Sequence, residues 1–233
     1  MQSCDFKKLL PHLIAIGIFA VVALFFSYPV LEGKELYQGD VMHWKSMAKE
    51  GIDWHEKTGE NVLWSNSMFG GMPTYTYYVP ESNNYLAYIH YSLFGAISKP
   101  ASFFLIAMLC FYMLMRCLKV NQWLSIGGAI AYALTSYNID SIIAGHDTKI
   151  FSVGYLPAVI AGVLYIYRSE WWKGIPLLGI SLALMISVAH YQIIYYAIIT
   201  IIFAIVGLFV IAIKQGKVKE FFISSGVALV VAG

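Results

Sequence analysis

Charged residues are scarce in this chain. Of its 233 residues, 12% are Asp, Glu, Lys or Arg, whereas 59% are hydrophobic. A soluble globular domain usually carries about 25% charged residues. The shortage of charge argues against a soluble protein and predicts a polytopic membrane protein. The 15 basic and 13 acidic residues give a formal net charge of +2 (15 − 13), which gives no reason to expect nucleic acid as a partner.

Cysteines are few, and familiar catalytic motifs are missing. The three cysteines do not suggest a disulfide framework, because Cys110 and Cys117 are seven residues apart on one apolar helix, about 10 Å by helical rise. The sequence contains no phosphate-binding loop, zinc-protease motif or nucleophile elbow. It also has no low-complexity linker and no clear internal repeat. Function therefore has to be inferred from the polar residues that interrupt the apolar runs.

Long apolar runs are abundant, and about 20 such residues cross a bilayer as a helix. Residues 174–213 contain no Asp, Glu, Lys or Arg. As one helix they would be about 60 Å long, twice the hydrocarbon thickness, so we expect two helices with a turn at 189–192. The predicted spans cover residues 9–31, 100–118, 122–143, 151–168, 174–189 and 192–213, and another begins at 221–233. Because this last run stops short, we expect a fragment of a longer chain.

Basic residues in the short loops assign the two sides of the membrane, because Lys and Arg gather in cytoplasmic loops. In the predicted topology nine of them share one side. They are Lys7, Lys8, Arg116, Lys119, Arg168, Lys173, Lys214, Lys217 and Lys219. The N-terminus is therefore predicted to be cytoplasmic. The long loop at 32–98 and the turns at 144–150 and 189–192 are predicted to be external.

The external loop at 32–98 is expected to carry membrane-surface helices. Val41 and Trp44 lie on the apolar face of an amphipathic helix that begins near Asp40, and such a helix lies on a membrane surface. A second amphipathic helix is predicted at 83–98, and an irregular packed loop lies between the two. Asp40 has an alternative interpretation as the N-cap of the first helix.

Ionisable residues at the external ends of the spans are the strongest functional signal. Charged groups beside the bilayer core are costly unless they are paired, hydrated or functional. The turn "GHDTK" places His146, Asp147 and Lys149 between two apolar runs, and "AHYQ" places His190 and Gln192 at the next external turn. A short polar loop without these groups would suffice to reverse the chain.

We expect these turns to meet the start of the long loop, which carries Asp40 and His43, in one external pocket. There the carboxylates would act on a substrate while Lys149 and the histidines bind a phosphate. Two alternatives stay open. One is an ion pair between Asp147 and Lys149 that only closes a turn. The other is a divalent cation bound by carboxylates and imidazoles, although the spacing fits no standard metal site.

Taken together, these motifs resemble the YfhO-type bacterial membrane proteins. The shared features are "QGD" (38–40) opening a long external loop after one span, "FGGMPT" (69–74) in that loop, "GHDTK" (145–149) after the third span and "AHYQ" (189–192) between the fifth and sixth. The resemblance covers nearly the whole chain, which would be the N-terminal transmembrane module of a longer protein. It implies an all-α polytopic membrane protein with a GT-C-like transmembrane helix bundle.

The resemblance also implies a function. GT-C enzymes are glycosyltransferases that use a polyprenyl-phosphate sugar as donor, here for a cell-envelope acceptor on the outer face of the bacterial plasma membrane. The acceptor would be a polymer, glycolipid or protein, and membrane lipids would surround the bundle. Asp40 matches the family's first acidic position and Asp147 the second, so both are assigned as catalytic. Many relatives have two adjacent acidic residues at the second position. This chain has His146-Asp147, which puts metal dependence in doubt, and no other cofactor is implied.

In the expected mechanism Asp40 is the general base. The residues expected to bind substrate are His43, His146, Lys149, His190 and Gln192. Two other functions stay open. A lipid or polysaccharide transporter would have polar residues at mid-depth and broken helices, and a non-catalytic scaffold would hold an envelope-assembly partner. The near absence of charge within the predicted spans favours chemistry on one side of the membrane.

Overall fold

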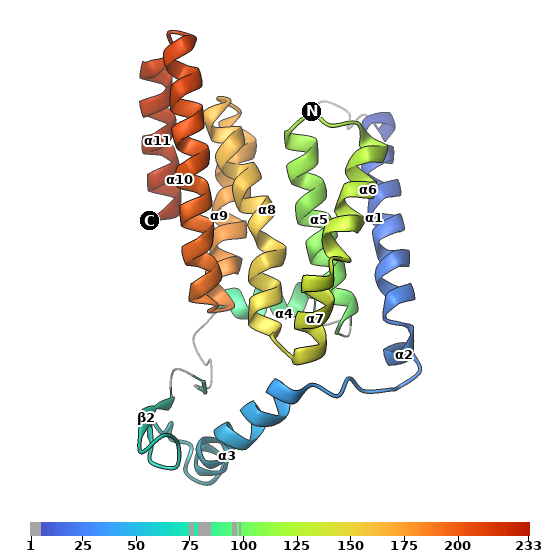
Figure 1. Ribbon diagram of the computed structural model, residues 1–233, viewed down its shortest axis with the longest axis vertical. Coiled ribbons are helices and arrows are strands. Elements are labelled where there is room, and N and C mark those ends of the chain that lie inside the picture. The colour runs from blue at the N-terminus through green and yellow to red at the C-terminus, as the bar shows by residue number, and fades with distance from the viewer. Residues whose placement is uncertain (1–5, 75–76, 79–84, 95–96, 98) are drawn as a thin grey trace.

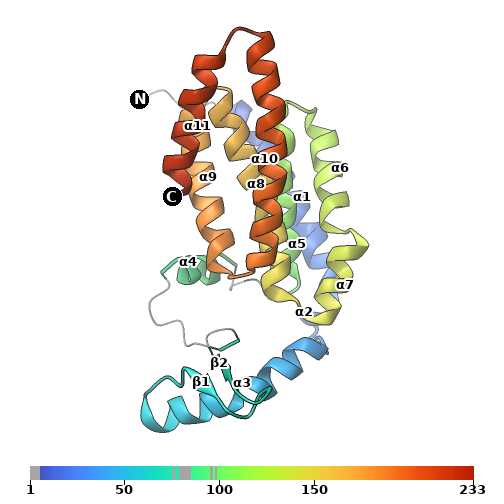
Figure 2. The same ribbon diagram turned by 60° about the vertical axis from the view of Figure 1, so that its left-hand side comes forward.

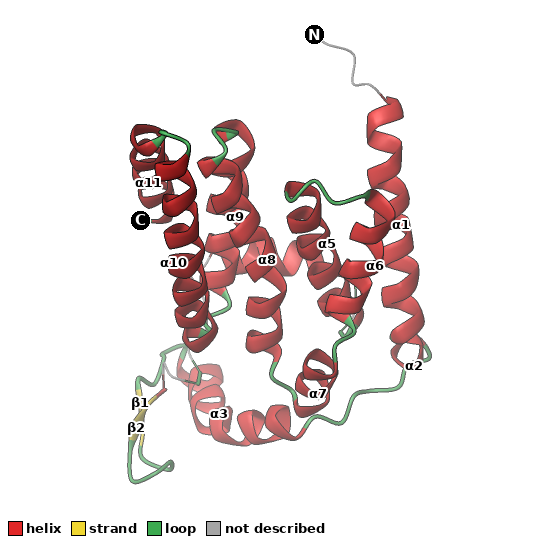
Figure 3. Cartoon of the chain, turned by 45° about the horizontal axis from the view of Figure 1, so that its top comes forward, coloured by secondary structure: helices red, strands yellow, loops and turns green. Residues whose placement is uncertain are grey.

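A computed structural model describes residues 6–74, 77–78, 85–94, 97 and 99–233. The described chain is mostly helical, as the sequence predicts. Long helices run side by side in alternating directions, and shorter elements gather at one end of them (Figures 1 and 3). We call this end, at the bottom of Figure 1, the loop end. The opposite end carries the short turns rich in Lys and Arg, and we call it the basic end.

The elements fall into two groups. The bundle consists of α1 (Phe6–Phe26), α5 (Ala101–Cys117), α6 (Gln122–Ala133), α8 (Asp147–Tyr167), α9 (Trp171–Ser187), α10 (Tyr191–Lys214) and α11 (Val218–Ala232). The loop end carries α2 (Tyr28–Leu31), α3 (Gly39–Thr58), β1 (Trp64–Ser65), β2 (Met72–Pro73), α4 (Tyr85–Phe94) and α7 (Ser136–Ala144).

Three helices in the described part of the chain are long and apolar enough to cross a membrane. These segments are Leu9–Phe26, Asp147–Tyr167 and Tyr191–Lys214. Helices α5 and α9 are apolar but shorter, with 17 residues each. The apolar window of α10 is only 11% buried, and in water so much exposed apolar surface would be unusual for a single chain. These features support the predicted membrane character.

Helix α8 is the centre of the bundle, because 67% of its apolar window is buried. Glycines bring it close to its neighbours. A Cβ added at Gly162 would lie 2.6 Å from the backbone nitrogen of Leu178, and one at Gly174 would lie 2.7 Å from the Ile166 side chain. Small residues at such crossings allow two helix backbones to approach each other closely, which is common between membrane helices. The position of α8 fixes where its first residues, Asp147 and Thr148, emerge at the loop end.

The segment predicted as one span at 122–143 forms two helices, so the expected continuous helix is not observed. Helix α6 has 12 residues, about 18 Å, and α7 follows after a break at Leu134 and Thr135. The Asn138 side chain donates hydrogen bonds to the carbonyl oxygens of Tyr132 (2.9 Å) and Ala133 (3.2 Å). These bonds satisfy carbonyls that the end of α6 would otherwise leave unpaired. Apolar content alone could not reveal this local capping.

The first predicted span, 9–31, also ends earlier than expected. Helix α1 stops at Phe26, and the four-residue α2 follows after Ser27. Pro29 stands in the first turn of α2, where its missing amide hydrogen is tolerated, whereas inside a longer α1 it would remove a hydrogen bond.

The loop at 32–98 is folded over its described parts. Helix α3 runs across the loop end, and β1 and β2 form a short antiparallel hairpin beside it (Figure 2). The motif "FGGMPT", where the sequence predicted an irregular loop, supplies the end of the hairpin turn and strand β2, and Trp64 pairs with Pro73. Helix α4 occupies Tyr85–Phe94 of the predicted 83–98 helix, and residues 83, 84, 95, 96 and 98 lie outside the described residues.

Candidate functional site

The polar motifs singled out in the sequence emerge at the same end of the bundle. The start of α3, the turn between α7 and α8, the segment before α5 and the turn between α9 and α10 all lie at the loop end (Figures 1 and 2). Contacts between their side chains, described next, make them one group, which we call the loop-end cluster. It consists of Asp40, Lys99, His146, Asp147, Thr148 and His190, together with Lys149, whose charge acts on His190.

Two close contacts dock the start of α3 on the turn before α8. The Gln38 side chain donates a hydrogen bond to the carbonyl oxygen of Ile142 at 2.5 Å. Gly145 has a φ of +96°, and a Cβ added there would lie 3.1 Å from side-chain carbons of Gln38 and Val41. Only glycine combines this backbone conformation with so close an approach. The "QGD" and "GHDTK" motifs therefore pack directly against each other.

Asp40 lies in the first turn of α3 and contacts His146. Its Oδ2 is 3.2 Å from Nε2 of His146, and the two side chains are 53% and 43% exposed. The N-cap of α3 is Gln38, so the alternative interpretation of Asp40 as the N-cap was wrong. The carboxylate is favourably placed near the positive end of the α3 dipole. An exposed carboxylate beside an imidazole is accessible to a substrate hydroxyl, which a general base requires.

Asp147 is the first residue of α8, and its ion pair within the described chain is with Lys99. The alternative pair with Lys149 does not form. The Lys149 ammonium lies 4.8 Å from the ring centroid of Tyr137, a cation–π contact. The Asp147 side chain is 23% exposed, and its Oδ1 is buried with no hydrogen-bond partner among the described residues. One carboxylate oxygen is thus engaged and the other remains available.

His190 joins the cluster from the turn before α10. Its Nδ1 is 3.1 Å from the Thr148 hydroxyl, and its Nε2 is buried without a hydrogen-bond partner in the described chain. Burial, and then the nearby Lys149 and His146, lower the pKa of His190 below the usual value for histidine. The imidazole is therefore neutral at pH 7, and its free Nε2 is available to a ligand.

Two residues expected to bind substrate make no contact that links them to the cluster. Gln192 is exposed and donates a hydrogen bond to the hydroxyl of Tyr196 within its own helix, at 2.9 Å. His43 is exposed on α3, about one turn beyond Asp40. Their roles remain predictions.

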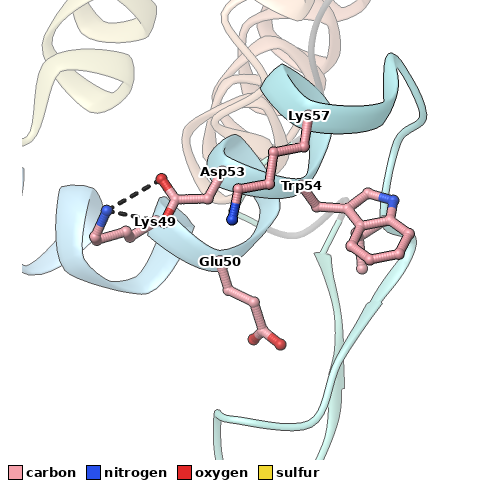
Figure 4. A pocket seen from close by; sticks show the side chains of 6 residues that line it. Lys49, Glu50, Asp53, Trp54 and Lys57 are labelled. Atoms are coloured by element: carbon pink, nitrogen blue, oxygen red, sulfur yellow. Dashed lines mark hydrogen bonds and ion pairs between the residues drawn. The ribbon is translucent and has the colours of Figure 1, made fainter.

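The loop-end cluster is open to solvent, and the hollows nearby lie on α3. One hollow of about 460 Å³ lies on the far half of α3 (Figure 4) and is lined by Lys49, Glu50, Asp53, Trp54, Lys57 and Val62. A second, of about 240 Å³, is lined by Glu35, Leu36, Tyr37, Gln38, Val41, Met42 and Lys45. Neither is lined by Asp147 or His190. Asp40, His146, Asp147 and His190 come from segments that contact one another, but neither hollow is the common pocket that the sequence predicted.

The arrangement of side chains does not favour a metal-binding site. Among the described residues, no three His, Cys, Asp or Glu side chains converge as ligands would. Asp147 instead has a lysine as its partner, and a lysine ammonium cannot coordinate a metal ion. The chemistry of the cluster rests on its acids, its bases and its lysines.

Sequence analysis missed Lys99 and Thr148. Lys99 had a detectable signal, because it is a lysine next to a predicted span on the external side, where the positive-inside rule expects few. Thr148 lies inside the "GHDTK" motif, but nothing in the sequence indicated that its hydroxyl would contact His190.

Comparison with known proteins did not identify a relative of this chain. No protein-family model matches this chain, and no curated protein or solved structure matches it. The resemblance to YfhO-type proteins therefore remains a prediction that rests on motifs.

Proposed function

We propose that the loop-end cluster is the catalytic site of a membrane glycosyltransferase. It would move a sugar from a polyprenyl-phosphate donor to an envelope acceptor at the outer face of a bacterial plasma membrane. One observation carries the proposal. Asp40, His146, Asp147 and His190 come from three segments far apart in the sequence, and contacts between side chains join those segments at one end of the bundle.

Asp40 is the general base in this reaction. Its carboxylate takes the proton of an acceptor hydroxyl while the hydroxyl oxygen forms a bond to the anomeric carbon of the sugar. The bond from that carbon to the phosphate oxygen breaks, and polyprenyl phosphate leaves with the electron pair. Base catalysis of this kind typically contributes about 10²- to 10⁴-fold to the rate. The exposure of Asp40 supports this role, because the acceptor must reach it from the aqueous side.

The basic groups of the cluster stabilise the leaving phosphate as its charge grows in the transition state. His146 is next to Asp40, and the free Nε2 of His190 can hydrogen-bond a phosphate or a sugar hydroxyl. Asp147 accepts a hydrogen bond on its unpartnered Oδ1 from a hydroxyl group of the sugar or of the acceptor. A buried carboxylate oxygen without a hydrogen-bond donor is unfavourable, and the ligand would supply that donor.

The break between α6 and α7 bears on the transporter alternative. Transporters use unwound backbone to coordinate substrates or ions with free carbonyl oxygens. Here the Asn138 side chain already donates to the carbonyl oxygens of Tyr132 and Ala133, so the break is stabilised from within the protein and does not need a ligand. The titratable cluster lies at the end of the bundle, which favours chemistry at one membrane face over transport through the bundle.

In the membrane, the basic end would face the cytoplasm and the loop end the outside. The described turns at the basic end carry most of the Lys and Arg predicted to be cytoplasmic, including Arg116, Arg168 and Lys217. A donor carried by a lipid in the outer leaflet would then present its phosphate at the level of the cluster.

The Asp40→Asn variant of the full-length protein tests the proposal. Membranes containing the protein would be given polyprenyl-phosphate glucose or polyprenyl-phosphate N-acetylglucosamine, and release of polyprenyl phosphate would be measured. We expect the variant to lose at least about 100-fold in rate. The matched control is Asp140→Asn, because Asp140 is exposed on α7 and outside the cluster.

Retention of wild-type rates in Asp40→Asn would remove the base assignment. If the wild type releases no polyprenyl phosphate from any donor while the protein still supports envelope assembly, the scaffold alternative would replace the enzyme.

A further inference from the structure

Lys99 has a distinctive position in the loop-end cluster. It lies two residues before α5, and its ammonium group reaches the first residue of α8, Asp147, 48 positions further along the chain. The same ammonium lies 5.8 Å from the ring centroid of Phe103. The side chain is still 48% exposed. Lys99 is therefore held in place on one side and open to a ligand on the other.

The hydrogen-bonding capacity of this region is only partly used. A lysine ammonium has three N–H donors, and the carboxylate oxygen of Asp147 takes up one of them. His190 has a buried Nε2 without a partner among the described residues. Lys99 contacts Asp147 and His190 contacts Thr148, so the two basic groups contact consecutive residues in the first turn of α8. Both have donors to offer.

The electrostatic surroundings favour an anion. Lys99 lowers the pKa of His90, and Lys149 and His146 lower that of His190, in both cases after the larger effect of burial. The first turn of α8 has no side-chain cap, so its backbone N–H groups add to the positive potential there. The cluster also holds two carboxylates, and each is already paired: Asp147 with Lys99 and Asp40 with His146.

We propose that Lys99 binds the phosphate group of the polyprenyl-phosphate donor and bridges it to the carboxylate of Asp147. This inference rests on the proposed function for its choice of lipid, but it concerns binding and not transfer. Lys99 donates one hydrogen bond to Asp147 Oδ2 and its remaining N–H groups to phosphate oxygens. Asp147 keeps the ammonium oriented towards the phosphate.

Binding of sugar-free polyprenyl phosphate to the full-length protein in lipid nanodiscs tests the inference. We expect wild type to bind polyprenyl phosphate at least about tenfold more tightly than polyprenol, which has the same chain without the phosphate. Lys99→Met should lose about tenfold in affinity for polyprenyl phosphate and nothing for polyprenol. Lys99→Arg should restore part of the loss, because a guanidinium also binds phosphate.

Lys34→Met is the matched control. Lys34 is another exposed lysine in the loop region, and its ammonium is paired with Glu32 at 2.9 Å. Its substitution should leave the affinity for polyprenyl phosphate unchanged. Asp147→Asn gives a second, independent arm, because it removes the negative charge, while the amide oxygen can still accept a hydrogen bond from Lys99 and keep it oriented. Its affinity for polyprenyl phosphate should stay the same or rise, in contrast to Lys99→Met.

Several results would overturn the inference. Wild-type affinity in Lys99→Met, even with transfer lost, would mean that Lys99 only positions Asp147. Equally tight binding of phosphatidic acid or inorganic phosphate would mean that the site does not recognise a polyprenyl phosphate. If polyprenyl phosphate binds through Lys99 and no sugar is transferred, the binding site stands and the proposed glycosyltransferase activity fails.

Discussion

The two ends of the bundle use their charged side chains in different ways. At the basic end, Arg116 donates to the backbone carbonyl of Val120, four residues away, and Arg168 donates to that of Cys117. The ion pair between Lys173 and Glu170 spans less than one helical turn. These charges mainly satisfy backbone groups and neighbours where the helices end.

At the loop end the corresponding contacts join side chains of separate elements directly to each other. Lys99 and Asp147 are 48 positions apart, and Thr148 and His190 are 42 positions apart. Arg168 also reaches a separate helix, since Cys117 is 51 positions away, but its partner there is a backbone carbonyl oxygen. Titratable side chains from separate elements pair with each other at the loop end, which is the arrangement that the proposed function expects of a binding site.

The largest effect is expected from adding a methyl group at Gly145. Ala at a φ of +96° is strained, and its Cβ would collide with Gln38 and Val41. The free energy of unfolding of Gly145→Ala should therefore be about 3 kcal/mol lower than that of wild type, and α3 should be displaced. Because Asp40 would leave His146, donor cleavage should fall at least about tenfold. The melting temperature in detergent and the release of polyprenyl phosphate measure the two effects.

Gly216→Ala is the matched change at the basic end. Gly216 has a φ of +68°, but nothing lies within 4 Å of an added Cβ. The free energy of unfolding of Gly216→Ala should be about 1 kcal/mol lower because of backbone strain alone, and the variant should keep the wild-type rate of sugar transfer. Equal losses of activity at the two positions would contradict the proposed difference between the ends.

An intermediate effect is expected from acidification, through His90. Its imidazole is buried against Phe151 and hydrogen-bonds the Tyr155 hydroxyl at 2.6 Å; burial and then Lys99 lower its pKa from 6.5 to about 4. Above pH 6.5 the imidazole is neutral in both the folded and the unfolded state. Between pH 6.5 and 4 the unfolded state binds a proton that the folded state does not. The free energy of unfolding should therefore decrease as the pH is lowered, by up to about 3 kcal/mol in total.

Melting temperatures of wild type and His90→Gln between pH 7 and 4.5 measure this effect, and the variant should show the shallower dependence. His12→Gln is the comparison from the basic end, because His12 also contacts a tyrosine hydroxyl, that of Tyr112, at 2.9 Å, but is itself exposed. If His12→Gln flattens the pH profile as much as His90→Gln, the burial of His90 is not the cause.

The smallest effect is expected from single hydroxyl groups. Thr148→Val removes the hydrogen bond to His190, and Ser225→Ala removes one of 2.8 Å to Tyr167, which ends α8 at the basic end. Each should lower stability by about 1 kcal/mol. Only Thr148→Val should also weaken donor cleavage, by a few-fold, because it releases His190. A matching loss of cleavage in Ser225→Ala would argue that the effect is a general consequence of lower stability.

The helical fold was predictable because apolar composition and length favour helices in a membrane. Apolar runs indicated where helices would lie, and the absence of charge over 174–213 indicated a hairpin. Structure and prediction differ where a few polar residues act locally. Thr135 and Asn138 divide the predicted third span, and Pro29 ends the first. Hydropathy averages over about 20 residues, so it does not detect capping by one side chain.

The candidate site was predictable only in part. The sequence singled out Asp40, Asp147 and His190 because ionisable groups beside apolar runs are costly without a partner or a function. It did not indicate which residues would pair. Asp147 binds Lys99 instead of Lys149, which is two residues away, because the first turn of α8 directs Lys149 towards Tyr137.

The sequence by itself determined the class of this protein, its helices and the segments that carry ionisable groups at their ends, because these depend on composition and short-range pattern. Only the tertiary structure decided that Asp40 contacts His146, that Lys99 contacts Asp147 and that Thr148 contacts His190. Such pairs depend on how helices far apart in the chain pack and on where their ends emerge. That packing is set by close contacts such as those at Gly145 and Gly162, which depend on the residues of two segments at once.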